Sequence, residues 1–130
     1  MRAHFVLYVS DQTKSATFYS NALDMIPTLA VPGMTEFSLN DGAILGLMPE
    51  SGIQRLLGPA LPDLSQSHGI PRAEIYLVTS NARQFHARAL AAGARELSPV
   101  SQRDWGDLAG YSLDPDGHVI AFAQSNRDDT

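Results

Sequence analysis

The sequence predicts an α+β fold in which two βαβββ modules form a curved mixed sheet around a cleft. A strand-like segment begins at His4 and runs into a helix start at Asp11, and a similar segment runs from Ala73 to Ser80, 69 positions later. A helical stretch follows each segment. Each half then closes with an Asp-Gly turn and an apolar strand, at residues 41–48 and 116–123. A supersecondary unit that recurs at a fixed period indicates stacked modules.

The composition indicates one globular domain, residues 1–130. The chain is 44% hydrophobic and 18% charged, which is ordinary for a protein with a real core. A net charge of −5 without any run of Lys or Arg argues against a nucleic-acid partner. The absence of cysteine excludes disulfides and thiolate chemistry. The chain starts on strand-like sequence and carries no apolar segment long enough to span a membrane, so we expect a soluble cytoplasmic protein.

The first module is predicted over residues 4–48. The alternation in residues 4–9 favours a strand, and Asp11 is an N-cap candidate for a helix over residues 12–23. Pro27 prevents that helix from continuing. Three short strands are expected after it, at residues 28–31, 35–39 and 43–48. The dipeptide Asp41-Gly42 before the last of them is a strong hairpin signal.

Residues 49–72 hold four prolines and are interpreted as a linker, in which residues 53–57 form one helical turn. The second module, residues 73–124, is predicted as a strand over 74–79, a helix over 82–92 that closes at Gly93, and strands at 95–100, 109–113 and 118–123. The turn Asp114-Pro115-Asp116-Gly117 precedes the last strand. The polar tail, residues 125–130, is expected to fray.

With these elements in place, the chain resembles the vicinal oxygen chelate superfamily of glyoxalase I, bleomycin resistance proteins and extradiol dioxygenases. The residues that carry the resemblance are Ser10-Asp11 with Phe18-Tyr19 at the start and Asp114-Pro115-Asp116-Gly117-His118 near the end. It covers roughly residues 4–123. The resemblance implies two modules around a shared cleft, frequent pairing into homodimers, and, in metal-using members, ligands from the first and last strands of each module.

Carried onto this chain, the first-strand ligand positions are His4 and, 69 residues later, Ala73. The last-strand positions, four residues after the glycine of each Asp-Gly turn, are Gly46 and Ala121. Only His4 can bind a cation, whereas a catalytic zinc site takes about three protein ligands, so we expect no metal cofactor. Glu74 would face the cleft only if its strand slipped by one residue, which would reverse every side chain of that strand. With that slip, His4 and Glu74 would be the ligands of a divalent metal. His68 and His118 fall in the linker and at a turn, and His86 is expected to be solvated on its helix.

The expected cleft is apolar, and roomy where Gly46, Ala73 and Ala121 stand. Such a surface suits a small organic molecule that a few polar groups orient. The predicted ligand-binding residues are His4, Val6, Tyr8, Gly46, Met48, Ile75, Leu77, Trp105, Tyr111 and Ala121.

The leading interpretation is a protein of the bleomycin-resistance type, working as a homodimer, that binds a small amphipathic molecule without a metal. The main alternative is a metal-dependent enzyme of the glyoxalase or dioxygenase type that uses His4 and Glu74. Two further hypotheses are open. One is a metal-free enzyme with His4 or Tyr8 as acid or base, and the other is a purely structural or dimerisation module. The residues leave open whether any reaction is catalysed and which molecule is bound.

Overall fold

The computed structural model describes residues 1–125, and the chain divides into two compact units. The first unit comprises Met1–Ser20 and Asp24–His68, and the second comprises Asn21–Leu23 and Gly69–Thr130. The tail that was expected to fray spans residues 125–130. Of these, residues 126–130 lie outside the described residues.

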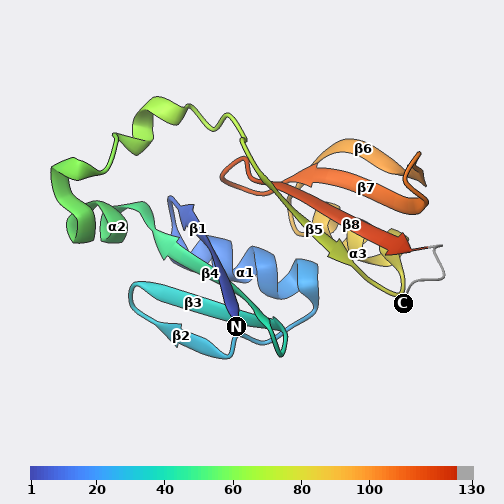
Figure 1. The fold of residues 1–130 in the computed structure, drawn as a ribbon, viewed down its shortest axis with the longest axis horizontal. Helices are drawn as coiled ribbons and strands as arrows, with labels where there is room; N and C mark the ends of the chain where they lie inside the picture. Colours follow the sequence, from blue (N-terminus) through green and yellow to red (C-terminus); the bar gives the residue numbers. More distant parts are fainter. Residues whose placement is uncertain (126–130) are drawn as a thin grey trace. The chain divides into compact units, whose positions relative to one another are not determined.

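The first unit contains one four-stranded mixed sheet (Figure 1). Its elements are β1 (Ala3–Val9), α1 (Gln12–Leu23, apart from its end Asn21–Leu23), β2 (Leu29–Val31), β3 (Met34–Asn40) and β4 (Ala43–Pro49). The strand order is β1-β4-β3-β2, with β1 parallel to β4 and the other neighbours antiparallel. The segment expected to form one helical turn is the longer helix α2 (Glu50–Leu57), followed by the 3₁₀ turns η1 (Gly58–Ala60) and η2 (Leu64–Ser67).

The second unit repeats this plan in the order β5-β8-β7-β6 (Figure 1). Its elements are β5 (Glu74–Val78), α3 (Ala82–Ala91), β6 (Arg95–Gln102), β7 (Asp107–Leu113) and β8 (Val119–Ser125). Only β5 and β8 pair in parallel. The predicted α+β class and the two βαβββ modules are therefore confirmed.

The two helices begin in the same way, but at an offset of 70 rather than 69. The Asp11 carboxylate accepts the Lys14 backbone N–H at the start of α1, and the Asn81 side chain accepts the Gln84 N–H at the start of α3 (81 − 11 = 70). The sequence prediction had matched Asp11 with Ser80. Ser and Asn are both good N-cap residues, so residue type alone did not distinguish the two adjacent positions.

One face of each sheet is on the side of its helix. In the first sheet Phe37, Leu45 and Leu47 are fully buried, and the Gln12 amide of α1 donates to Thr35 Oγ1 on the same side at 3.0 Å. In the second sheet the rings of Phe85 on α3 and Phe122 on β8 lie 5.4 Å apart. We call the opposite face of each sheet its distal face.

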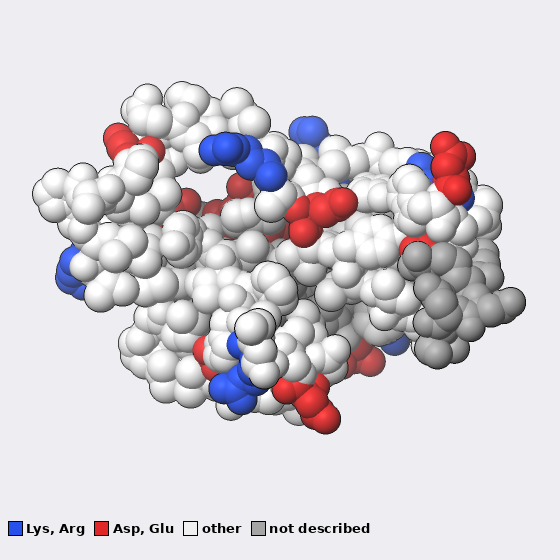
Figure 2. Space-filling view, viewed as in Figure 1, with Lys and Arg blue, Asp and Glu red and all other residues white. Residues whose placement is uncertain are grey.

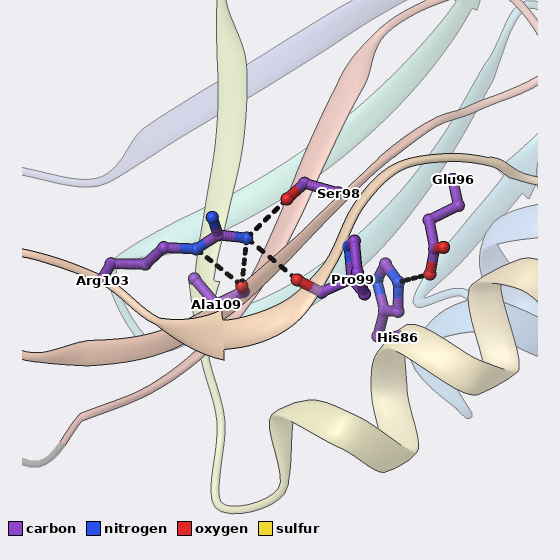
Figure 3. A network of polar contacts seen from close by, with 6 residues as sticks. All are labelled: His86, Glu96, Ser98, Pro99, Arg103 and Ala109. Carbon is purple, nitrogen blue, oxygen red and sulfur yellow. Dashed lines mark hydrogen bonds and ion pairs between the residues drawn. The ribbon is translucent and has the colours of Figure 1, made fainter.

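His86 is buried, so the expectation that it is solvated was wrong. It lies on the buried stripe of α3 with Ala82 and Ala89, at the spacing that places residues on one helix face. Its Nε2 is 2.8 Å from Glu96 Oε2 on β6 (Figure 3). A Cβ atom at Gly110 would lie 2.8 Å from His86 Nδ1, so the missing side chain of Gly110 is what lets the imidazole pack against β7.

Charged side chains on the face drawn in Figure 2 lie in small separate groups of either sign. Among the described residues, no helix is both long and apolar enough to cross a membrane.

Candidate functional site

The strand register fixes which positions of the two sheets correspond. Gly46 on β4 lies opposite Val6 on β1, and Ala121 on β8 lies opposite Tyr76 on β5. Both Gly46 and Ala121 stand four residues after the glycine of an Asp-Gly turn. Val6 and Tyr76 are therefore equivalent, again at an offset of 70. The counterpart of His4 is Glu74, and its assignment to Ala73 was wrong.

This register also corrects the faces expected for β5. Glu74 and Tyr76 lie on the distal face of the second sheet together with Ala121. Ile75 and Leu77 pair with Ile120 and Phe122 and point toward α3. They do not share a face with Ala121 as predicted, because the one-residue error in the offset reverses every side chain of the strand.

On the first sheet the predicted residues do share the distal face. His4, Val6 and Tyr8 alternate along β1, and Gly46 and Met48 stand opposite Val6 and Tyr8 on β4. The sequence prediction missed Glu36 on β3, which lies on the same face opposite Gly46.

Glu36 supplies the carboxylate partner of His4 that spacing alone had not identified. Its Oε2 lies 3.4 Å from His4 Nδ1, and the two side chains are 21% and 37% exposed. A carboxylate at Nδ1 orients an imidazole and leaves Nε2 for other contacts. The ion pair lies near the surface of the protein, since both side chains keep part of their surface in water.

The space expected above Gly46 is partly filled. A Cβ atom at Gly46 would lie 3.2 Å from Val6 Cγ2 and 3.3 Å from Met34 Sδ. These distances are tighter than an ordinary van der Waals contact, so the neighbours already close over the glycine. The first distal face is therefore not roomy at this position.

The second distal face carries a chain of hydrogen bonds between aromatic side chains and a buried carboxylate. The Trp105 indole N–H donates to the Tyr76 oxygen at 2.8 Å, and the Tyr76 hydroxyl donates to Asp107 Oδ2 at 2.6 Å. Asp107 is fully buried, whereas Trp105 is 50% exposed. We call Trp105, Tyr76 and Asp107 the aromatic chain.

The aromatic chain explains why β8 carries alanine at this point. Tyr76 is on β5 and Asp107 on β7, with β8 between them. Neighbouring strands are about 4.8 Å apart, so the Tyr76 side chain must cross β8 to reach Asp107. Among the β8 residues on this face, Ala121 lies opposite Tyr76, and Ala123 follows it toward Ser125, which lies opposite Asp107. Both alanines are fully buried. Ala121 also lies opposite Tyr111 on β7, and so stands between two tyrosines.

Burial raises the pKa of Tyr76, and its hydrogen bond to Asp107 adds to that shift, while the bond from Trp105 opposes it. Burial likewise raises the pKa of Tyr111, followed by the negative charge of Glu74, and the Arg103 cation opposes this shift. Both phenols are therefore neutral near pH 7, and Tyr76 remains a hydrogen-bond donor to Asp107.

Arg103 holds the turn from which the aromatic chain extends (Figure 3). Its Nε and Nη2 donate to the Ala109 carbonyl at 3.0 and 2.8 Å, and Nη2 also donates to Ser98 Oγ and the Pro99 carbonyl, each at 2.9 Å. The guanidinium carbon lies 5.2 Å from the centre of the Tyr111 ring. Arg103 was not among the predicted site residues, because no local sequence pattern marks an arginine that bonds backbone carbonyls.

The sequence model of the Glyoxalase/Bleomycin resistance protein/Dioxygenase superfamily matches residues 2–122. The chain belongs to this superfamily. The resemblance inferred from the two turns and the repeat is thus confirmed, since this is the vicinal oxygen chelate group.

Three relatives illustrate the range of similarity. An uncharacterized protein of Mycobacterium bovis is 27% identical over 94% of this chain and 82% of its own length. The crystal structure of a glyoxalase-related enzyme from Fulvimarina pelagi is 25% identical, with a TM-score of 0.81 over 96% of this chain and 88% of that one. A family enzyme from Burkholderia phytofirmans is 12% identical and shows the fold, with a TM-score of 0.78 over 93% and 95% of the two chains.

The residues present do not fit the metal that many superfamily members use. With the corrected offset, the four ligand positions hold His4, Gly46, Glu74 and Ala121, of which two offer a donor atom. Within residues 1–125, no group of three or more His, Cys, Asp or Glu side chains is arranged to hold a metal ion. A catalytic site of the zinc type needs about three such ligands.

Proposed function

We propose that this superfamily member binds a small amphipathic organic molecule without a metal and without chemical turnover. The observation that carries the proposal is the second distal face, where Ala121 replaces a metal ligand and stands between Tyr76 and Tyr111. Aromatic side chains bury much apolar surface and lose few rotamers on binding. Tyr76 and Trp105 are also held in place before any ligand arrives, which reduces the ordering cost of binding.

Trp105 is the only tryptophan of the chain and gives a direct test. Protein stripped of metal with a chelator is screened by thermal shift against small amphipathic aromatic compounds, and hits are titrated by Trp105 fluorescence. Compounds that raise Tm are expected to change the emission. The variant Tyr76→Phe should bind them about tenfold more weakly, because Trp105 then loses its hydrogen-bond partner.

Ile26→Ala is the control, since Ile26 is an exposed apolar side chain outside both sheets, and it should leave the affinity unchanged. If no compound changes either Tm or the Trp105 emission, the proposal is contradicted. Stoichiometric Zn, Ni, Fe or Mn in the purified protein that is lost with His4→Ala would also contradict it.

A metal-dependent enzyme that uses His4 and Glu74 is the second candidate. The observation that favours it is the corrected offset, which puts Glu74 where the first unit has His4. Further ligands would have to come from a partner chain. Metal analysis separates the two functions: equal loss of bound metal and of activity in His4→Ala and Glu74→Ala, with the fold intact by circular dichroism, would replace the metal-free proposal.

Pairing with a second copy is part of the proposal. Leu56 and Leu57 on α2 and Ile70 in the linker are exposed. Burying such side chains against another copy releases apolar surface from water. Sedimentation equilibrium is expected to give a dimer that Leu56→Asp weakens, and a monomer at all concentrations would contradict the pairing.

A further inference from the structure

Arg103 is a cation that the second unit holds in place without a counter-charge. Its Nε and Nη2 donate to the Ala109 carbonyl, and Nη2 also donates to Ser98 Oγ and the Pro99 carbonyl. All of these acceptors are neutral. Among the described residues, no carboxylate forms an ion pair with Arg103. Its positive charge is therefore fixed in position and not neutralised.

The third nitrogen of this guanidinium, Nη1, is unused. It points away from the acceptors of the other two nitrogens (Figure 3). It has no hydrogen-bond partner within residues 1–125, yet it is not a buried atom, and Arg103 as a whole is only half-buried. Nη1 carries two N–H donors. These two donors are therefore open to a molecule that approaches from solvent.

A second unused donor stands beside Arg103 on the same face. The guanidinium carbon lies 5.2 Å from the centre of the Tyr111 ring, and Ser98, which accepts from Arg103, is opposite Tyr111 in the register. The Tyr111 hydroxyl also lacks a partner in the described part of the chain and is not buried. Because burial raises the pKa of Tyr111, the hydroxyl keeps its proton near pH 7 and can donate it.

The carboxylates of this face do not cancel the Arg103 charge. Glu74 acts on the Tyr111 phenol more strongly than Arg103 does, but it is exposed, and its backbone lies two residues along and two strands across from Tyr111. That separation is roughly 12 Å, more than the Debye length at physiological salt, so the charge of Glu74 is largely screened. Asp107 has the smallest effect of the three charges on the phenol. An anion in direct contact with Nη1 is therefore governed by Arg103.

We propose that Arg103 and Tyr111 form a carboxylate-binding position, so that the amphipathic ligand of the second distal face is an organic anion. The carboxylate accepts from Nη1 of Arg103 and from the Tyr111 hydroxyl. The apolar part of the ligand lies over Ala121, which is opposite Tyr111. Hydrogen bonds between charged partners are about twice as strong as neutral ones, and a guanidinium that is already ordered loses little freedom on binding. This inference rests on the proposed function and names the chemical class of its ligand.

Three bicyclic probes of similar size test the ligand class. 2-Naphthoate is an anion, 2-naphthamide is its neutral counterpart of nearly the same shape, and 2-naphthylmethylamine is a cation at neutral pH. Binding is measured by isothermal titration calorimetry, which needs no optical reporter. We expect 2-naphthoate to bind at least about tenfold more tightly than 2-naphthamide, and 2-naphthylmethylamine to bind most weakly.

Variants assign this preference to named groups. Arg103→Gln should weaken 2-naphthoate about tenfold and change the affinity for 2-naphthamide less than about twofold, because only the anion depends on the charge. Tyr111→Phe keeps the ring and should weaken 2-naphthoate about fivefold through the lost hydroxyl. Arg83→Gln is the control, since it removes an exposed cation from α3 and should change neither affinity.

Arg103→Gln also removes bonds that hold its turn, so a salt titration of the unaltered protein gives a second test. Added salt should reduce the preference for 2-naphthoate over 2-naphthamide at least about twofold, because it screens the charge interaction.

Equal affinity for 2-naphthoate and 2-naphthamide, or tighter binding of the cation, would overturn the inference while leaving the binding function in place. A preference for 2-naphthoate that survives both Arg103→Gln and added salt would also overturn it. If no probe binds, hits of the broader compound screen that lack an anionic group would overturn it as well, and a screen without any hit would mean that the proposed function itself fails.

Discussion

The two distal faces grow from one structural plan and carry different chemistry. Corresponding positions, ordered from the first unit to the second, hold His4 and Glu74, Val6 and Tyr76, Glu36 and Tyr111, and Gly46 and Ala121. The first face has a partly exposed ion pair, and the second has an aromatic chain that ends on a buried carboxylate. The repeat thus retains strand register and helix caps, while the side chains of the site differ completely.

The difference in burial decides how much each carboxylate contributes to stability. A partly exposed ion pair gains little, because water screens it and two long side chains must be ordered. A buried carboxylate is costly to desolvate, and removal of a partner leaves the other group unsatisfied. Matched truncations on the two faces should therefore give unequal effects.

The largest difference is expected between Asp107→Ala and Glu36→Ala. Asp107→Ala leaves the Tyr76 hydroxyl without its acceptor and should lower the free energy of unfolding by about 2 kcal/mol. Glu36→Ala should cost less than about 1 kcal/mol. Urea unfolding followed by circular dichroism measures both. Asp107→Asn is the control, since its amide oxygen can still accept from Tyr76 and should restore part of the loss. Equal costs for the two alanine variants would show that the faces do not differ in this way.

The next largest effect is expected at the centre of the aromatic chain. Tyr76→Phe removes both the acceptor of the Trp105 N–H and a donor to the buried Asp107 carboxylate, and should lower the free energy of unfolding by about 1.5 kcal/mol. Trp105 should then become more mobile, which lower fluorescence anisotropy and a red-shifted emission would report. Tyr111→Phe removes a hydroxyl from the same face and should leave the Trp105 emission as it is. A Trp105 signal that does not respond to Tyr76→Phe would show that the indole is held by other contacts.

Most of the fold could be predicted because its signals are local. Asp11, the Asp41-Gly42 turn and the Asp114-Pro115-Asp116-Gly117 turn each act through the backbone conformation of adjacent residues. The helix bounds of α1 and the positions of all eight strands followed from such signals to within two or three residues.

The site was harder because it depends on register. Counting back from Gly46 through a regular hairpin, with Asn40 opposite Ala43, leads to Phe37 on β3. The register shift between Ser38 and Asn40 puts Glu36 there instead, and no local sequence signal marks that shift. The same count from Ala121 leads to Tyr76 only after β5 is known to pair in parallel with β8, a contact between distant segments. The chain from Trp105 through Tyr76 to Asp107 joins residues 29 and 31 positions apart and has no local signature.

A smaller effect is expected from adding a methyl group at the equivalent positions of β4 and β8. Gly46→Ala brings a Cβ against Val6 and Met34, which offsets the gain from a more rigid backbone and should leave the free energy of unfolding within about 1 kcal/mol of the wild type. In a Val6→Ala background the same change should be more favourable by about 0.5 kcal/mol. A double-mutant cycle in urea measures this coupling. Ala121→Gly, the reverse change on the second sheet, should only destabilise, and a vanishing coupling between positions 6 and 46 would contradict the close contact.

The smallest effect concerns alkaline pH and is specific to the second face. The pKa values of Tyr76 and Tyr111 are raised above the ordinary value of 10.0, so the folded chain holds these protons more tightly than the unfolded chain. Their contribution to stability is complete below about pH 10, where both states are protonated, and is lost as the pH rises through the folded-state pKa values. The free energy of unfolding should therefore fall as the pH rises above about 10, less steeply in the double variant Tyr76→Phe, Tyr111→Phe. An equally steep fall in that variant would place the alkaline loss elsewhere in the chain, because a phenylalanine carries no proton to release.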